Sequence, residues 1–256
     1  MNSWLLSDAH THMGGESEWE ERLDRQLLSL LCASTPSEAD ALLSRLTSCG
    51  SPEFLIPTFG LHPWQAASGC LSEMEAYFPL APVIGEIGMD SVWCDVPLTQ
   101  QEAVFRHQLA LAETLHKPVI LHTKGQEERI AEILRDYPGT YLIHWYSSPK
   151  PPLAFLALNC YFSIGPDVWW NPAVHQTAAL VPENRLLIET DGLGAVTWAD
   201  EEAPESAKAG HPPKALTVSA SLQRTLFEIA KIRRLTPENA GSLFHRNLCR
   251  FLNQLP

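Results

Sequence analysis

The chain has 256 residues, 45% of them hydrophobic, which is enough to bury a substantial core in one large α/β domain or two small ones. No stretch approaches the roughly 20 apolar residues of a membrane span, so we do not expect a membrane protein. The first residues contain no basic region followed by a long apolar one, so we do not expect a secretory leader. The formal net charge of −12 argues against a basic surface for nucleic acid. It does not exclude a local phosphate site, because bound divalent metals would add positive charge.

The cysteines are scattered along the chain and form no CxxC pair. In a chain of this length, such usage indicates reduced, mostly structural thiols. We therefore expect a cytoplasmic protein, without a membrane partner and without a stable protein partner. The six positions are Cys32, Cys49, Cys70, Cys94, Cys160 and Cys249.

Short β-rich runs alternate along the chain with longer amphipathic segments. The runs predicted as strands lie at 4–6, 28–33, 54–59, 82–87, 118–121, 141–143, 160–164 and 186–188. The segments predicted as helices lie at 37–48, 99–116, 125–137, 171–180, 214–232 and 236–253, and Pro36-Ser37-Glu38 and Thr236-Pro237-Glu238 mark two helix starts.

Eight strands joined by segments of crossover length predict a TIM-type (β/α)8 barrel that occupies a single domain, residues 1–256. A doubly wound open sheet is the structural alternative. Residues 13–27 hold one weak helical pattern, so we expect an irregular first βα unit. The Ala/Pro/Glu-rich stretch 199–213 is predicted to be a long loop after the eighth strand.

The sequence Ser-Asp-Ala-His-Thr-His occupies residues 7–12, directly after the first predicted strand. Alternate side chains of a strand share a face, so Asp8, His10 and His12 would project the same way on a strand. Two imidazoles aimed at one point are a candidate metal site, and a nearby carboxylate is suited to orient one of them. A polar loop whose histidines happen to alternate is the alternative.

Residues of the same chemistry recur at the ends of other predicted strands, where barrels of this type carry their chemistry. Each has an ordinary alternative: a lone histidine such as His62 is more often a hydrogen-bonded structural residue, and Glu189 and Asp191 are suited to cap the next segment. The joint placement favours function, since desolvated polar groups at one barrel mouth need a metal or a substrate to satisfy them. The set comprises His10, His12, His62, Glu86, His122, His144 and Asp191.

Nitrogen and oxygen ligands together suit Zn²⁺, Mn²⁺ and other first-row ions. Four histidines and two carboxylates are more than a single catalytic ion needs, because such an ion usually keeps three protein ligands and a water. Two ions bridged by one carboxylate use the set better. Such a pair activates a water and holds both oxygens of an in-line displacement at phosphorus.

Several sequence blocks follow one another in a specific order: DAHTH at 8–12, GLHPW at 60–64, GEIGMD at 85–90, QQEAVFRHQLALAETLHKPVILH at 100–122, ETD at 189–191 and the closing LTPENAGSLFHRNLCRFL. Their order and spacing resemble the TatD family of metal-dependent deoxyribonucleases, a branch of the amidohydrolase-like barrels. The resemblance covers nearly the whole chain. It implies a (β/α)8 hydrolase with two divalent ions, of zinc, manganese or magnesium.

When the family's metal ligands are matched to this sequence position by position, the resemblance implies that two groups of ligands hold the ions and that Glu86 bridges them. The first group is His10, His12 and Asp191, and the second is His122 and His144.

The same resemblance implies roles for the residues around the ions. Asp191 would be the general base that takes a proton from the attacking water, with Glu86 as the other catalytic carboxylate, and the neighbouring ions would keep Asp191 ionised. His62 would lie near the scissile group, and Lys124 would contact a phosphate as a point charge. Asp8 would orient a ligand imidazole.

The segments that face substrate in the family differ in this chain. After His144 the sequence is WYSS where the family usually has CFSG, and after ETD it is GLGA where a small residue, proline and tyrosine are common. GHPP at 210–213 stands where the family has Arg-Asn-x-Pro, and Lys124 stands at an arginine-type position. The metal-ligand pattern is therefore complete, while the substrate-facing pattern is altered.

Three functions follow from these observations. The leading one is a divalent-metal-dependent hydrolase of phosphodiester bonds, a deoxyribonuclease acting on short or single-stranded DNA ends. The altered segments leave open hydrolysis of an amide or ester on the same barrel, since a metal-activated water attacks carbon as well as phosphorus. A non-catalytic scaffold is the third. Aromatic residues either stack on bases or pack the rim: Trp64, Trp145, Tyr146, Trp169 and Trp170.

Overall fold

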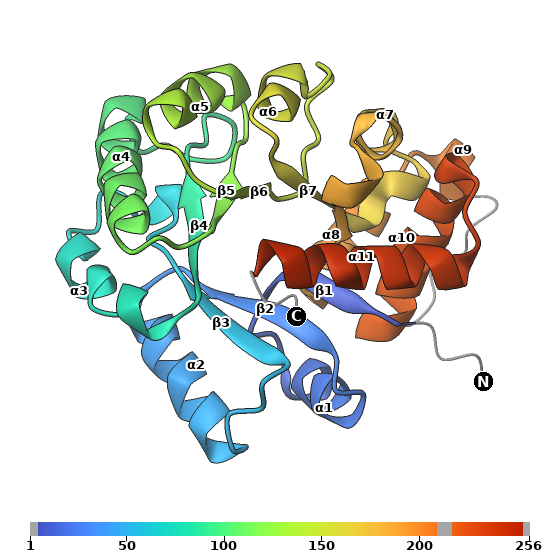
Figure 1. Cartoon of the computed structure of the whole chain (residues 1–256), viewed down its shortest axis with the longest axis horizontal. Coiled ribbons are helices and arrows are strands. Elements are labelled where there is room, and N and C mark those ends of the chain that lie inside the picture. The colour runs from blue at the N-terminus through green and yellow to red at the C-terminus, as the bar shows by residue number, and fades with distance from the viewer. Residues whose placement is uncertain (1–4, 209–216, 253–256) are drawn as a thin grey trace. The chain divides into compact units, whose positions relative to one another are not determined.

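Eight strands form one sheet whose hydrogen-bonded order follows the chain from β1 to β8 in the computed structural model, which describes residues 5–208 and 217–252 (Figure 1). The strand pairs with a defined register, β3/β4, β4/β5, β5/β6 and β7/β8, are parallel. This order, with helices between the strands, confirms the predicted (β/α)8 fold. The strands are β1 (Ser7–His12), β2 (Leu28–Ala33), β3 (Leu55–Phe59), β4 (Val83–Gly88), β5 (Val119–His122), β6 (Tyr141–Ile143), β7 (Tyr161–Ile164) and β8 (Leu186–Ile188).

The helices lie mostly between consecutive strands, and two long ones close the chain. They are α1 (Glu16–Asp24), α2 (Pro36–Ser48), α3 (Leu71–Glu75), α4 (Leu98–Thr114), α5 (Glu127–Ile133), α6 (Leu153–Ala157), α7 (Pro172–Leu180), α8 (Leu193–Glu201), α9 (Glu205–Lys208), α10 (Val218–Arg233) and α11 (Pro237–Phe251). Short 3₁₀ turns are η1 (Pro63–Gln65), η2 (Phe78–Leu80), η3 (Leu134–Asp136), η4 (Pro166–Trp169) and η5 (Glu183–Arg185). Among the described residues, no helix combines the length and apolarity that crossing a membrane requires.

The chain divides into two compact units. The terminal unit comprises Met1–Ser29, Trp145–Pro151 and Phe162–Pro256, and the central unit comprises Leu30–His144 and Pro152–Tyr161.

The core of the central unit lies between the parallel strands and the helices that cover them. All six residues of β4 are buried, as expected for a strand covered on both faces. Helix α4 packs against β4 (Figure 1). Its residues Phe105 and Leu109 are buried. The same face carries two buried glutamines, Gln101 and Gln108, whose amides bind the backbone of the loops that follow β4 and β3.

The core of the terminal unit is built on the last two long helices. Helix α11 packs against β1 and β8, and α10 packs against α7 and α11 (Figure 1). Buried Asn247 of α11 donates to the carbonyls of Glu183 and Leu186 at the start of β8, at 2.7 and 2.8 Å. These contacts fix β8, which ends directly before the Glu-Thr-Asp motif.

Glu21 of α1 supplies a carboxylate to the start of α10. It accepts hydrogen bonds from the N–H groups of Val218 and Ser219, at 2.7 and 3.1 Å, and from the Ser219 hydroxyl. A negative charge there also compensates the helix dipole. Burial alone would raise the pKa of Glu21, but the hydrogen bonds from Ser219 and Val218 outweigh it and hold the pKa below its ordinary value.

Glu21→Gln is expected to lower the free energy of unfolding at neutral pH by about 1 kcal/mol, because an uncharged amide binds these donors less strongly. Since the folded-state pKa is lowered, the contribution of Glu21 is complete above the ordinary glutamate value of about 4.3. It is lost as the pH falls through the folded-state value. Urea unfolding at pH 7 and pH 4 measures this, with exposed Glu20→Gln on the same helix as the control. An equal difference between wild type and variant at both pH values would contradict the assignment.

Two sequence predictions of secondary structure are wrong. The first strand is Ser7–His12, not 4–6: Leu5 is 49% exposed, whereas five of the six residues of β1 are buried. The stretch 199–213 is not a continuous loop, because α8 extends to Glu201 on buried Val196 and Ala199 and α9 follows. Residues 4 and 209–216 lie outside the described residues.

The remaining boundaries differ by a few residues. Thr35 and Thr236 cap α2 and α11 through their hydroxyls, with proline at the first helical position of each, as the predicted helix starts require. The predicted helix 125–137 is α5 followed by η3. The first crossover is short, as predicted, and contains the single helix α1 of nine residues.

Candidate functional site

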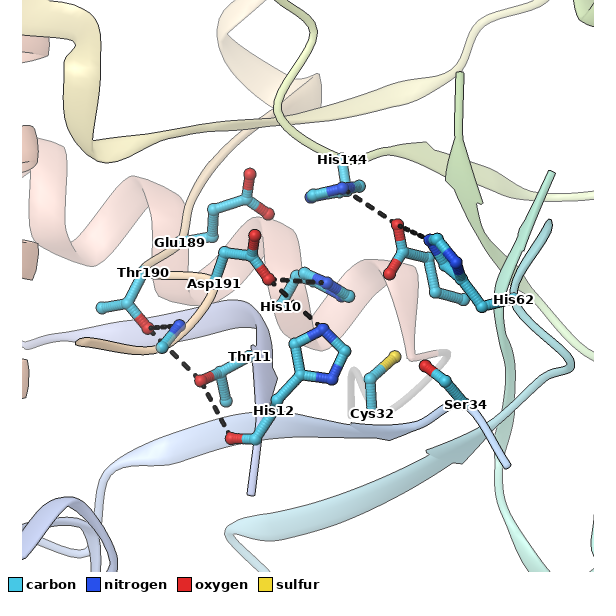
Figure 2. Close-up of polar contacts among 12 residues, drawn as sticks. His10, Thr11, His12, Cys32, Ser34, His62, His144, Glu189, Thr190 and Asp191 are labelled. Atoms are coloured by element: carbon cyan, nitrogen blue, oxygen red, sulfur yellow. Dashed lines mark hydrogen bonds and ion pairs between the residues drawn. The ribbon is translucent and has the colours of Figure 1, made fainter. Parts of the chain in front are cut away.

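In the terminal unit, two imidazoles and one carboxylate converge at the end of β1 (Figure 2). His10 Nε2 and His12 Nε2 lie 3.3 and 3.5 Å from Oδ1 of Asp191. The two histidines alternate on β1 and therefore share a face, as predicted. Asp191 follows β8; its N–H donates to the His10 carbonyl at 3.1 Å and its φ of 57° is left-handed. The side chain of His10 is buried, while that of His12 is 44% exposed, so the group opens to solvent on the His12 side.

Behind this group lies a buried polar network centred on Arg22 of α1. The Arg22 guanidinium is inaccessible to solvent and lies 2.9 Å from Oδ2 of Asp8. It also donates to the hydroxyls of Ser29 and Thr11, at 2.8 and 2.9 Å. The N–H and hydroxyl of Thr190 donate to the two oxygens of Asp8, at 2.9 and 2.6 Å. The network thus connects β1 to the residue that precedes Asp191.

Asp8 was predicted to orient a ligand imidazole. Its carboxylate binds Arg22 and Thr190, and the role toward an imidazole stays a prediction. Thr190 directly precedes Asp191, so Asp8 acts on the position of that carboxylate.

Arg22→Met is expected to lower the free energy of unfolding by about 3–5 kcal/mol, because it leaves the buried Asp8 carboxylate without its cation. Chemical denaturation of the two proteins measures the loss. The control is Arg25→Met, since the Arg25 side chain is 55% exposed and forms a surface pair with Glu21. A loss below about 1 kcal/mol for Arg22→Met would show that the network carries little stability.

In the central unit, three imidazoles surround one carboxylate oxygen of Glu86, on β4. Figure 2 labels two of them, His62 and His144. His122 Nδ1, His144 Nε2 and His62 Nε2 lie 2.8, 3.0 and 3.7 Å from Glu86 Oε1. All four side chains are at least nine-tenths buried. One ligand atom each from His62, Glu86 and His122 lies within 4.8 Å of the other two, which is a geometry able to hold a metal ion. Nitrogen and carboxylate donors of this kind suit Zn²⁺ and Mn²⁺.

Asp90 is a site residue that the sequence analysis did not select, although it closes the quoted motif GEIGMD. Its buried Oδ2 accepts from His122 Nε2 at 3.0 Å and from Trp64 Nε1 at 2.8 Å. Its Oδ1 accepts from the N–H groups of Val92 and Trp93. A carboxylate on the far nitrogen of an imidazole fixes the ring's orientation and raises its basicity, as around many metal-binding histidines.

Burial and hydrogen bonding have opposite effects on the pKa values of Asp90 and His122. Burial alone would raise the pKa of Asp90, but hydrogen bonds from His122, from the two backbone N–H groups and from Trp64 outweigh it and hold the pKa far below its ordinary value. Burial alone would lower the pKa of His122, but hydrogen bonds to Asp90 and Glu86 raise it. Asp90 therefore stays ionised in a buried position.

Helix α4 fixes the two loops that carry this cluster. Gln108 accepts from the N–H of Leu61 at 2.8 Å and donates to its carbonyl, next to His62. Gln101 binds the N–H and carbonyl of Asp90 in the same way, at 2.8 and 2.9 Å. Helical spacing of seven residues places both amides on one face of α4.

The predicted site residues thus form two groups, each within one unit. Lys124 follows β5 and its ammonium lies over the ring of Trp93, 4.2 Å from the centroid. The proposed sharing of ions between the two groups stays a prediction. The groups are His10, His12 and Asp191 in the terminal unit, and His62, Glu86, His122 and His144 in the central unit.

The sequence matches a family model described as TatD related DNase over residues 7–253. An uncharacterized metal-dependent hydrolase, YabD of Bacillus subtilis, is 26% identical, with 95% of this chain and 100% of that protein covered. A protein of Edwardsiella piscicida named 3'-5' ssDNA/RNA exonuclease TatD is 33% identical, with 75% of this chain and 79% of that protein covered.

Solved structures share the fold. The Escherichia coli TatD homolog YJJV superposes with a TM-score of 0.79 at 21% identity, covering 98% of each chain. An uncharacterized amidohydrolase from Saccharomyces cerevisiae superposes with a TM-score of 0.74 at 13% identity, covering 97% of this chain and 100% of the other.

Proposed function

Since the chain belongs to the TatD related DNase family, we propose that it is a divalent-metal-dependent hydrolase of phosphodiester bonds. The substrate in this proposal is short or single-stranded nucleic acid, above all the end of a DNA strand. The observation that carries the proposal is the buried group around Glu86, in which three imidazole nitrogens lie within 3.7 Å of one carboxylate oxygen. Relatives named as 3'-5' exonucleases of single-stranded DNA and RNA support the choice of substrate.

The ligand set that we propose combines both groups in one centre with two ions. Support comes from the strand order, because consecutive strands of a (β/α)8 barrel present their carboxyl ends at one face, and these residues stand at the ends of β1, β4, β5, β6 and β8. Bound divalent ions would supply positive charge to a phosphodiester and acidify the attacking water. The proposed ligands are His10, His12 and Asp191 for one ion, His122 and His144 for the other, and Glu86 for both.

Other side chains of the protein would then transfer the proton and bind the substrate. Asp191 would accept the proton of the attacking water, which its exposed edge and its place beside two imidazoles favour. His62, on the loop after β3, would donate a hydrogen bond to the phosphodiester. Lys124 would bind a neighbouring phosphate through its ammonium. Asp8 and Asp90 would position Asp191 and His122 from behind.

An amide or ester substrate is not favoured, because relatives that are 30–35% identical in sequence are named as nucleases. The same names weigh against a scaffold without activity. We further propose that residues 1–256 form one catalytic domain, since a single family model covers most of both units. A cytoplasmic location fits the cysteine usage.

The proposal is tested with the full chain, loaded in turn with Mg²⁺, Mn²⁺ and Zn²⁺, on single-stranded oligonucleotides labelled at the 5' or the 3' end. We expect cleavage that chelator abolishes and that the 5' label shows as a ladder of shortened products. Bis-p-nitrophenyl phosphate and a panel of aryl esters are run in parallel. Ester hydrolysis without phosphodiester hydrolysis, or no hydrolysis above a Glu86→Ala control with any metal, would overturn it.

A further inference from the structure

Three large apolar side chains are exposed beside the central-unit cluster. Trp64 is 48% exposed, Val92 56% and Trp93 50%, although most large apolar residues of the chain are buried. All three residues hydrogen-bond to the carboxylate of Asp90, which accepts from the indole nitrogen of Trp64 and from the backbone N–H groups of Val92 and Trp93. Grouped apolar exposure of this kind marks a binding surface more often than single exposed residues do.

The loop that presents Trp93 is held in place on both sides. Besides the bonds to Asp90, the N–H of Ser91 donates to the carbonyl of Lys124 at 3.0 Å, and the Gln126 amide donates to the Ser91 hydroxyl at 3.0 Å. A Cβ at Gly125, whose φ is +71°, would lie 2.5 Å from Ser91 Oγ, so the two loops are in close contact. The indole is therefore displayed on a fixed support, and binding to it costs little ordering entropy.

Positive charge lies on the same surface. The ammonium of Lys124 is 4.2 Å from the centroid of the Trp93 ring. A half-exposed aromatic ring with a cation over one face matches the repeating unit of a single strand, in which a flat base alternates with a phosphate. A base pair inside a duplex offers no free face to such a ring, whereas an unpaired base does.

We propose that Trp64 and Trp93 form a stacking platform for an unpaired nucleobase, with Lys124 binding a phosphate of the same strand; the proposal rests on the function proposed above. It makes this site selective for single-stranded nucleic acid ends. Oδ2 of Asp90 accepts from both Trp64 Nε1 and His122 Nε2. The platform is thereby fixed to a proposed metal ligand, which sets the spacing between the stacked base and the reacting phosphate.

The test compares Trp93→Ala and Trp93→Phe with wild type on two substrates, a short single-stranded oligonucleotide and an abasic strand of the same length, which has no base to stack. We expect Trp93→Ala to raise KM for the oligonucleotide about tenfold, the loss of one stacking contact, with KM for the abasic strand unchanged. Trp93→Phe keeps an aromatic face and should stay within about threefold of wild type on both. Trp198→Ala is the control for removing an exposed tryptophan, since Trp198 of α8 is 44% exposed.

A binding measurement separates this inference from the catalytic proposal. Tryptophan fluorescence of the full chain in chelator is titrated with the oligonucleotide and with an abasic strand of the same length. We expect wild type to bind the oligonucleotide more tightly than the abasic strand, and we expect Trp93→Ala and Trp64→Ala to lose this difference. That result supports the platform even if no substrate is cleaved. Equal affinity for the two strands, or equal effects of Trp93→Ala on both hydrolysis substrates, would overturn the platform while leaving the hydrolase proposal to its own test.

Discussion

Glu86→Ala is expected to lower kcat for phosphodiester hydrolysis about a thousandfold, the order found when one preorganised electrostatic contact of an active site is removed. Glu86 Oε1 is the atom on which His122, His144 and His62 converge. Its removal takes away the carboxylate proposed to hold both ions. Steady-state kinetics at saturating metal measures the loss, and circular dichroism confirms that the variant folds.

The matched control for this prediction is Glu75→Ala. Glu75 also lies within 2.8 Å of a histidine, His107, but on the surface, where such a pair contributes little. We expect kcat of Glu75→Ala within about twofold of wild type. A Glu86→Ala enzyme that keeps more than a tenth of wild-type kcat would show that Glu86 is a structural residue.

Asp191→Asn is expected to lower kcat by about 10²- to 10⁴-fold, the usual contribution of a general base, while KM changes little. The substitution keeps the size of the side chain, and asparagine tolerates the left-handed backbone at this position as well as aspartate does. The separate effects on kcat and KM, measured with the oligonucleotide and with bis-p-nitrophenyl phosphate, test the role.

Asp136→Asn is the control for Asp191→Asn, because the Asp136 side chain is 69% exposed and takes part only in a surface pair with Arg106. It should leave both kinetic constants unchanged. A rise in KM with unchanged kcat in Asp191→Asn would assign that carboxylate to substrate binding and remove it as the base.

The sequence predicted the fold because strands and helices rest on local periodicity, whereas the ligand set followed from the family resemblance and stays a prediction. Alternation on a strand places His10 and His12 on one face whatever surrounds them, and the structure brings both to Asp191. The first strand was misplaced for a related reason: an apolar run was expected to mark it. Buried Thr11 and Asp8 of β1 bind Arg22 and Thr190, partners that periodicity does not reveal.

Long-range hydrogen bonds account for what the sequence did not predict. Asp90 was passed over because its function depends on His122 and Trp64, which are 32 and 26 residues away along the chain. The Asp8 carboxylate binds an arginine 14 residues away along the chain, a partner that no local sequence pattern indicates. Trp93 lies in a stretch without periodicity, and only the contacts of its loop with Asp90 and Lys124 give it a role.

The two groups of ligands are proposed to share a pair of ions through Glu86, and metal analysis measures that sharing. The full chain is purified without chelator, equilibrated with Zn²⁺ or Mn²⁺, desalted and measured by plasma mass spectrometry. We predict about two ions per chain, the number that two-metal hydrolases bind, and fewer than one in Glu86→Ala. Less than one ion per wild-type chain, unchanged by added Zn²⁺ or Mn²⁺, would show that the two groups do not share a pair of ions.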